Sequence, residues 1–196
     1  MTSMDDIGYV ESPGLLSPAQ REDGEPPGAR RFYGKYRGSV VQNTDPLGMG
    51  RLLVSVPDVF GLFPSSWAMP CVPLAGLQSG VFVVPAPQAG VWVEFEGGNP
   101  DHPIWTGFFW GSRAETPTTA STLVPASPAF LVESTGKSKV VVSDTPVAPM
   151  KGGGVLLQSP SAAITVDGSG VTITAPTINI VGLVNINNGA LVVKTA

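Results

Sequence analysis

Pairs of apolar residues repeat toward the end of the chain, and this pattern limits the possible folds most strongly. In each pair one residue separates the two apolar positions, which is the period of two expected of a β-strand. Most pairs begin seven residues after the one before: Ile164/Val166, Val171/Ile173, Ile178/Ile180, Val184/Ile186 and Leu191/Val193. A coiled coil also repeats every seven residues, but the intervening Gly, Pro, Thr and Asn disfavour helix and the β-branched Val and Ile favour strands. The pattern therefore predicts repetitive β-structure.

Such strands in a single chain would expose an apolar stripe and an unpaired sheet edge, which is an aggregation hazard. Three chains wound around one axis would bury each stripe and pair each edge. The composition agrees, because 42% of the residues are hydrophobic and only 13% are charged, so surfaces are expected to be buried between subunits. We predict a homotrimer in which residues 130–196 form an intertwined trimeric β-helix, here called the needle.

Residues 32–113 have a different texture, with short strand patterns separated by Gly, Pro, Asn and Asp. No helical segment of any length is apparent. Short strands in this number predict a small Greek-key barrel, so the whole chain is predicted to be all-β. The expected strands are Tyr33–Val41, Arg51–Pro57, Trp67–Val72, Gly80–Pro85, Gly90–Glu96 and Pro103–Phe109.

Two segments lack sustained periodicity. Residues 1–31 are rich in Pro and charge and are predicted to form an extended arm that becomes ordered against a partner. A leader without function is the alternative for that segment. Residues 114–129 are rich in Thr, Ser and Pro and are predicted to be a linker.

The sequence offers little material for catalysis. The single histidine, His102, lies between Asp101 and Pro103 in a predicted turn and is interpreted as a surface or packing residue. The single cysteine, Cys71, lies in an apolar run and is predicted to be a small buried side chain. Two such residues are too few for a catalytic zinc site. We expect no enzyme activity, no metal and no cofactor.

Other chemistry is disfavoured as well. A net charge of −4 argues against nucleic acid as a partner. Glu94 and Glu96 share one face of a predicted strand but are interpreted as solvated or interchain charges rather than an acid–base pair. Gly152–Gly154 lacks the Lys of a phosphate loop and is interpreted as a flexible joint. The start of the chain lacks a secretory signal and no stretch reaches ~18 apolar residues, so assembly in the cytoplasm is expected.

An ordered series of motifs resembles the baseplate spike proteins of contractile phage tails (baseplate assembly protein V) and of related type VI and extracellular injection systems. Any one motif is weak, but the series in this order is specific. The first half contributes Gly38–Pro46, Gly50–Pro57, Trp67–Pro70, Gly90–Pro100 and Pro103–Gly107, and the second half contributes Phe130–Pro146 and Val184–Val193.

This resemblance implies an oligosaccharide/oligonucleotide-binding (OB) barrel followed by the trimeric needle. It further implies a structural spike at the centre of the baseplate, which docks on a trimeric hub protein and pierces the target envelope when the sheath contracts. The chain departs from some relatives, because residues 114–129 are too few for a lysozyme domain and the chain has no histidine pair for a metal-binding apex. A separate small tip protein (PAAR-like) is therefore expected to dock on the terminal residues, namely Leu191, Val192, Val193, Lys194, Thr195 and Ala196.

Three barrel residues are candidates for contacts with the hub or between chains: Arg51, Trp92 and Glu94. For Trp92 and for Trp67, packing in the core is the competing interpretation. Two other functions remain open from the sequence. One is a carbohydrate- or nucleic-acid-binding OB module on a trimeric stalk, and the other is an enzyme that degrades the cell envelope.

Overall fold

The computed structural model describes residues 30–123 and 127–183. Residues 1–29 of the predicted arm (1–31) and the predicted tip-binding residues 191–196 lie outside this part of the chain. The chain divides into two compact units, Met1–Gly111 and Ser112–Ala196. Among the described residues, no helix combines the length and the apolar character needed to cross a membrane.

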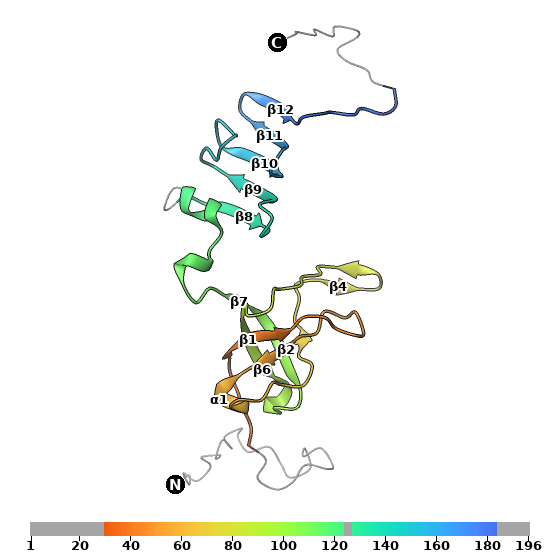
Figure 1. Ribbon diagram of the computed structural model, residues 1–196, viewed down its shortest axis with the longest axis vertical. Coiled ribbons are helices and arrows are strands. Elements are labelled where there is room, and N and C mark those ends of the chain that lie inside the picture. The colour runs from red at the N-terminus through yellow and green to blue at the C-terminus, as the bar shows by residue number, and fades with distance from the viewer. Residues whose placement is uncertain (1–29, 124–126, 184–196) are drawn as a thin grey trace, which may run out of the picture. The chain divides into compact units, whose positions relative to one another are not determined.

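The first unit is a small β-barrel (Figure 1). Its strands follow the order β2-β1-β6-β7-β3 in one sheet. Beyond β2 and β3, Leu52 and Ala68 exchange two backbone hydrogen bonds of 3.1 and 2.8 Å, which join the two ends of the sheet. The barrel predicted from the sequence is confirmed. Its strands are β1 (Tyr36–Gln42), β2 (Leu53–Ser55), β3 (Met69–Pro70), β6 (Gly90–Phe95) and β7 (Pro103–Phe109).

Alternation along β6 builds the centre of the barrel core. Val91, Val93 and Phe95 are buried, whereas the residues between them are half-buried on the outer face. This is the pattern expected of a strand with a single core face. The indole of Trp105 is also buried, and its Nε1 donates to the carbonyl oxygen of Gly50 at 3.1 Å. A buried polar group of this kind needs such a partner.

The segment between β3 and β6 differs from the prediction. No strand covers Gly80–Pro85 as a whole. Instead β4 (Ala75–Gly76) and β5 (Ser79–Gly80) form a short hairpin, and the chain returns to the barrel in extended form. A four-residue helix, α1 (Pro57–Phe60), was not foreseen. The prediction that Cys71 is buried is wrong, because the structure places it at the surface.

The second unit contains a five-stranded antiparallel sheet in which the strands lie side by side in chain order (Figure 1). The predicted pairs Ile164/Val166 and Val171/Ile173 lie in strands, but Ile178/Ile180 follows the last described strand and belongs to none. The remaining pairs lie outside the described residues. The strands are β8 (Ala129–Glu133), β9 (Lys139–Ser143), β10 (Gly154–Gln158), β11 (Ala163–Asp167) and β12 (Gly170–Thr174).

The backbone pairing of this sheet differs from what the sequence led us to expect. Each of these strands pairs with its neighbour in the same chain, over five residue pairs at every junction. The expectation that sister chains are needed to satisfy the backbone is therefore wrong for β9, β10 and β11, which pair on both sides within the chain. Among the described residues, β8 and β12 pair on one side only, and one face of the sheet leaves its side chains uncovered.

One face of the sheet carries a small core of its own. Val141 and Leu156 are fully buried there, together with Ala163, Val147 and Met150. The last two come from the connection between β9 and β10, which folds back over this face. No segment of the described residues covers the opposite face in this way.

The predicted linker contacts this sheet. It contains two 3₁₀ turns, η3 (Arg113–Glu115) and η4 (Thr118–Thr122). The carboxylate of Glu133 accepts hydrogen bonds from Thr118 Oγ1 at 3.1 Å, from the backbone N–H of Thr119 at 3.3 Å and from Lys137 Nζ at 3.0 Å. These donors, led by Thr119 and Lys137, lower the pKa of Glu133 from 4.5 to about 2.

Gly152–Gly154 lead into β10, and the structure gives Gly153 and Gly154 a role other than the flexible joint expected from the sequence. A Cβ atom on Gly153 would overlap the backbone carbonyl of Asp144, and one on Gly154 would overlap the carbonyl oxygen of Val166. Gly154 also has a positive φ of 158°. Glycine is required here because two backbone segments approach too closely for any side chain.

Candidate functional site

The uncovered face of the C-terminal sheet presents two rows of large apolar side chains. Every strand contributes one residue to each row, because residues two apart on a strand point to the same face. We call these the apolar rows. The first row is Phe130, Val142, Val155, Val166 and Val171, and the second is Val132, Val140, Leu157, Ile164 and Ile173.

Strand register holds each row in line. Val155 on β10 is paired with Val142 on β9 and with Val166 on β11. In the second row Leu157 is paired in the same way with Val140 and Ile164. Directly opposed residues in an antiparallel sheet have Cβ atoms about 5 Å apart, so each row forms a continuous apolar ridge across the sheet.

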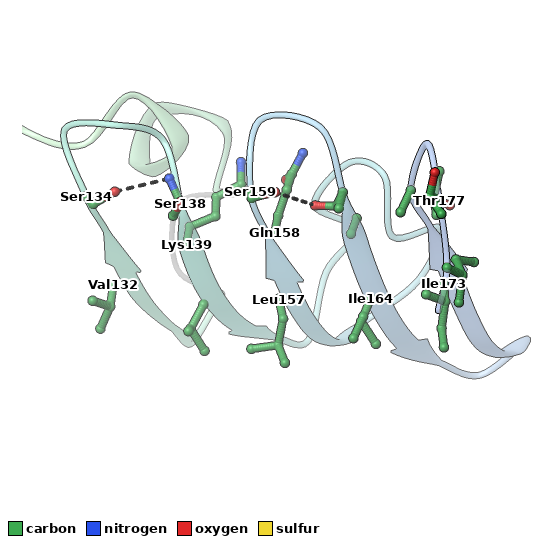
Figure 2. Close-up of a pocket in the computed structure, with 16 residues that line it drawn as sticks. Val132, Ser134, Ser138, Lys139, Leu157, Gln158, Ser159, Ile164, Ile173 and Thr177 are labelled. Atoms are coloured by element: carbon green, nitrogen blue, oxygen red, sulfur yellow. Dashed lines mark hydrogen bonds between the residues drawn. The ribbon is translucent and has the colours of Figure 1, made fainter. Parts of the chain in front are cut away.

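The apolar rows remain open to solvent in the isolated chain. Exposed fractions run from 37% for Val140 to 66% for Val171. Figure 2 shows Val132, Leu157 and Ile164 projecting from the same side of the sheet. A shallow hollow of about 580 Å³ lies along the second row and extends toward Ile178. Apolar patches of this extent on a soluble protein mark an interaction surface.

Arg51 in the barrel is occupied by an interaction within the chain. Its Nη2 and Nε atoms lie 2.7 and 3.1 Å from Asp45 Oδ1, and its guanidinium lies 5.3 Å from the ring centroid of Trp67. Asp45 also accepts backbone hydrogen bonds from Leu47, Met49 and Arg51 itself. The Arg51 hydrogen bond holds the pKa of Asp45 well below its usual range. This arrangement fixes the turn between β1 and β2.

Trp92 and Glu94 lie on the outer face of β6. Arg51 lies elsewhere in the barrel, in the turn that leads into β2. The ring of Trp92 is half-buried, with its centroid 4.9 Å from that of Phe109 and 5.1 Å from the guanidinium of Arg37. Glu94 accepts a hydrogen bond of 2.6 Å from Lys35 Nζ, and their side chains are 39% and 54% exposed. Contacts of Arg51, Trp92 and Glu94 with a hub or another chain stay predictions.

The residues considered for metal binding and catalysis can be placed in the structure. No group of three or more His, Cys, Asp and Glu is placed to hold a metal within 30–123 and 127–183. His102 lies exposed in its turn. The carboxylate of Glu94 is tied to Lys35 rather than directed at Glu96.

Reasoning from the sequence found only part of the apolar rows. The pairs on β11 and β12 were identified, but Phe130/Val132, Val140/Val142 and Val155/Leu157 were not counted with them. The sequence did contain a signal for these three pairs, because in each pair one residue separates the two apolar positions. The irregular lengths of the turns between β8, β9 and β10 broke the seven-residue spacing and concealed it.

Comparison with known protein families gives two matches whose limits follow the observed elements. Residues 36–110 match the type VI secretion system/phage-baseplate injector OB domain, from the first residue of β1 to just beyond β7. Residues 129–192 match the phage baseplate V C-terminal trimerisation domain, starting at the first residue of β8. No curated protein matches the chain.

A baseplate injector barrel followed by a trimerisation domain defines the class of protein. The chain belongs to the baseplate spike proteins of contractile injection systems, the family of phage baseplate protein V. Both matched domains are structural components of baseplates. The chain is therefore a component of a phage tail or of a type VI-like system.

Proposed function

We propose that the protein is the central spike of its baseplate, which docks on the hub protein through the barrel and pierces the target envelope when the sheath contracts. The observation that carries this proposal is the pair of apolar rows within the matched trimerisation domain. Function then lies in stiffness and docking, not in a pocket with reactive groups.

The apolar rows explain why three chains would associate. When three sheets turn the same face toward one axis, ten large apolar side chains from each chain leave water together. Burial of the exposed part of each Val, Leu or Ile contributes on the order of 1 kcal/mol, so each chain gains on the order of 10 kcal/mol. A dry, closely packed core on the axis resists compression and bending, because protein interiors have low compressibility.

The partners follow from the same proposal. Trp92 and Glu94 are accessible on the outer face of the barrel and could contact the hub or a neighbouring chain. Arg51 supports such a contact only indirectly, since its guanidinium is already bound to Asp45. We further propose that Leu191–Ala196 receive a small PAAR-like tip protein and that the particle is assembled in the cytoplasm.

A charge placed in the apolar rows tests this function in cells that produce the particle. Val155 lies in the middle of the first row, so Val155→Asp would force three carboxylates into the shared core, at a cost of several kcal/mol each. We expect particles without a functional spike and a loss of envelope puncture of at least tenfold. Release of a cytoplasmic marker from target cells measures this.

The matched control is Thr172→Asp, which adds the same charge to β12 on the opposite face of the sheet, where Thr172 is exposed. This variant is expected to retain puncture. If Val155→Asp particles puncture target cells as well as the control does, the apolar rows do not build the spike.

A further inference from the structure

The barrel carries a second apolar surface that the proposed function does not use. Residues 59–93 contain no Asp, Glu, Lys, Arg or His. Within this run, residues 72–87 leave the barrel and return, and we call them the uncharged hairpin. The hairpin extends away from the barrel strands with β4 and β5 at its end (Figure 1). Its backbone is held by the β4–β5 pairs and by a hydrogen bond of 2.9 Å from Val81 N–H to Leu74 O.

Large apolar side chains of the uncharged hairpin are exposed. Leu77 at the turn is 95% exposed, Phe82 is 66% exposed and Leu74 is 61% exposed. Exposure of large apolar side chains in an ordered turn without charged residues of its own is unfavourable in water. The exposed side chains are explained if another protein surface covers the hairpin in the assembled protein.

A groove with matching character lies at the base of the same hairpin. Its volume is about 480 Å³, and Met49, Met69 and Val72 contribute to its walls together with Phe82 and Trp105. Two features order this groove: Trp105 donates to the Gly50 carbonyl, and the Phe82 ring lies so close to Gly50 that a Cβ atom there would meet it at 3.2 Å. A preformed, mostly apolar concavity is the usual receptor for an apolar anchor.

We propose that the uncharged hairpin of one protomer inserts Leu77 into this groove on the next protomer, so that the three barrels form a ring. This inference rests on the trimer of the proposed function and adds a second interface to it. The occupant is thus another copy of the same chain.

Charge argues for a copy as the occupant. An uncharged patch gains nothing from a charged partner, which would have to lose its hydration on binding. The next copy offers an equally uncharged surface, and the trimerisation domain in the same chain raises the local concentration of that copy to the millimolar range.

Symmetry argues for the same occupant. The anchor and the groove are different patches of one protomer, so their contact is heterologous and repeats from chain to chain. Such a contact closes into a ring when its rotation matches the symmetry of the assembly. A trimerisation domain imposes that closure at three copies.

Cross-linking of the full-length protein tests the inference, because Cys71 is exposed and lies in the chain between Pro70 and Val72, which both line the groove. In Leu77→Cys, the new thiol should lie near Cys71 of the next protomer. A short bis-maleimide should then link the three chains of most trimers into a covalent trimer on a denaturing gel. Leu62→Cys is the matched control, since Leu62 is 100% exposed in the same barrel but outside the uncharged hairpin.

Two further outcomes separate this inference from the proposed function. Leu77→Cys combined with Cys71→Ser should lose the cross-link, and covalent dimers from this double variant would contradict an anchor-in-groove contact. If Leu77→Cys sediments as a trimer but links no better than Leu62→Cys, the hairpin contact is wrong and the trimeric spike stands. If the chain is monomeric, the proposed function itself fails.

Discussion

Arg51 and Lys35 each pair with a carboxylate in the barrel, yet the two pairs differ in burial. The side chains of Arg51 and Asp45 are 17% and 3% exposed, whereas those of Lys35 and Glu94 are 54% and 39% exposed. An exposed pair contributes little because water screens it, but removal of one partner from a buried pair leaves a charge without compensation.

Substitution of these two cations should therefore give unequal effects. We expect Arg51→Ala to lower the melting temperature of the protein clearly, because Asp45 loses two hydrogen bonds and the β1–β2 turn loosens. Lys35→Ala should leave the melting temperature almost unchanged. Thermal unfolding followed by circular dichroism compares them. Equal, small changes would instead favour Arg51 as a surface residue kept for contact with a partner.

At the scale of the element, the entry into β10 depends on the absence of a side chain. Gly154 combines a φ of 158° with the approach of the Val166 carbonyl, and it begins the strand at the centre of the sheet. The connection from β9 to β10 covers the core around Val141 and Leu156, and it can enter β10 only if the backbone at Gly154 passes close to the Val166 carbonyl.

Gly154→Ala should lower the free energy of unfolding by roughly 2–4 kcal/mol per chain, through strain and displacement of β10 or β11. Gly168→Ala is the matched control, because a Cβ atom there meets nothing within 4 Å. Denaturant unfolding of both variants measures the difference. A Gly154→Ala protein as stable as the control would show that the close approach relaxes without cost.

The elements also show what the sequence could and could not predict. β6 and β7 were predicted well because alternation reveals a strand when one face must be core. The run Val81–Val84 has the composition of a strand, but Gly80 and Pro85 flank it and none of the described strands pairs with it. The prediction that Cys71 is buried failed because apolar neighbours in the sequence do not determine which side of a segment faces the core.

The candidate site was predictable only in outline. A repeat of apolar pairs indicates a sheet that needs a partner, and that much followed from Ile164/Val166 and Val171/Ile173. Which strands pair, and within which chain, depends on the turns. The Arg51–Asp45 pair likewise required the path of the β1–β2 turn, because the six-residue separation of these residues allows many other arrangements.

At the scale of the whole molecule, a trimeric spike requires that two further copies of the chain cover the apolar rows. The backbone of β9, β10 and β11 is paired on both sides within one chain, so we expect association to depend on side-chain burial and not on exchange of these strands. In the proposed function the two matched domains act together, the trimerisation domain joining the chains and the OB domain docking on the hub.

Sedimentation velocity of the purified full-length protein at micromolar concentration tests this requirement most directly. The account predicts a single species with three times the chain mass, with no dissociation as the protein is diluted within that range. A stable, soluble monomer would contradict it, because the apolar rows would then tolerate water and the spike would lose its physical basis.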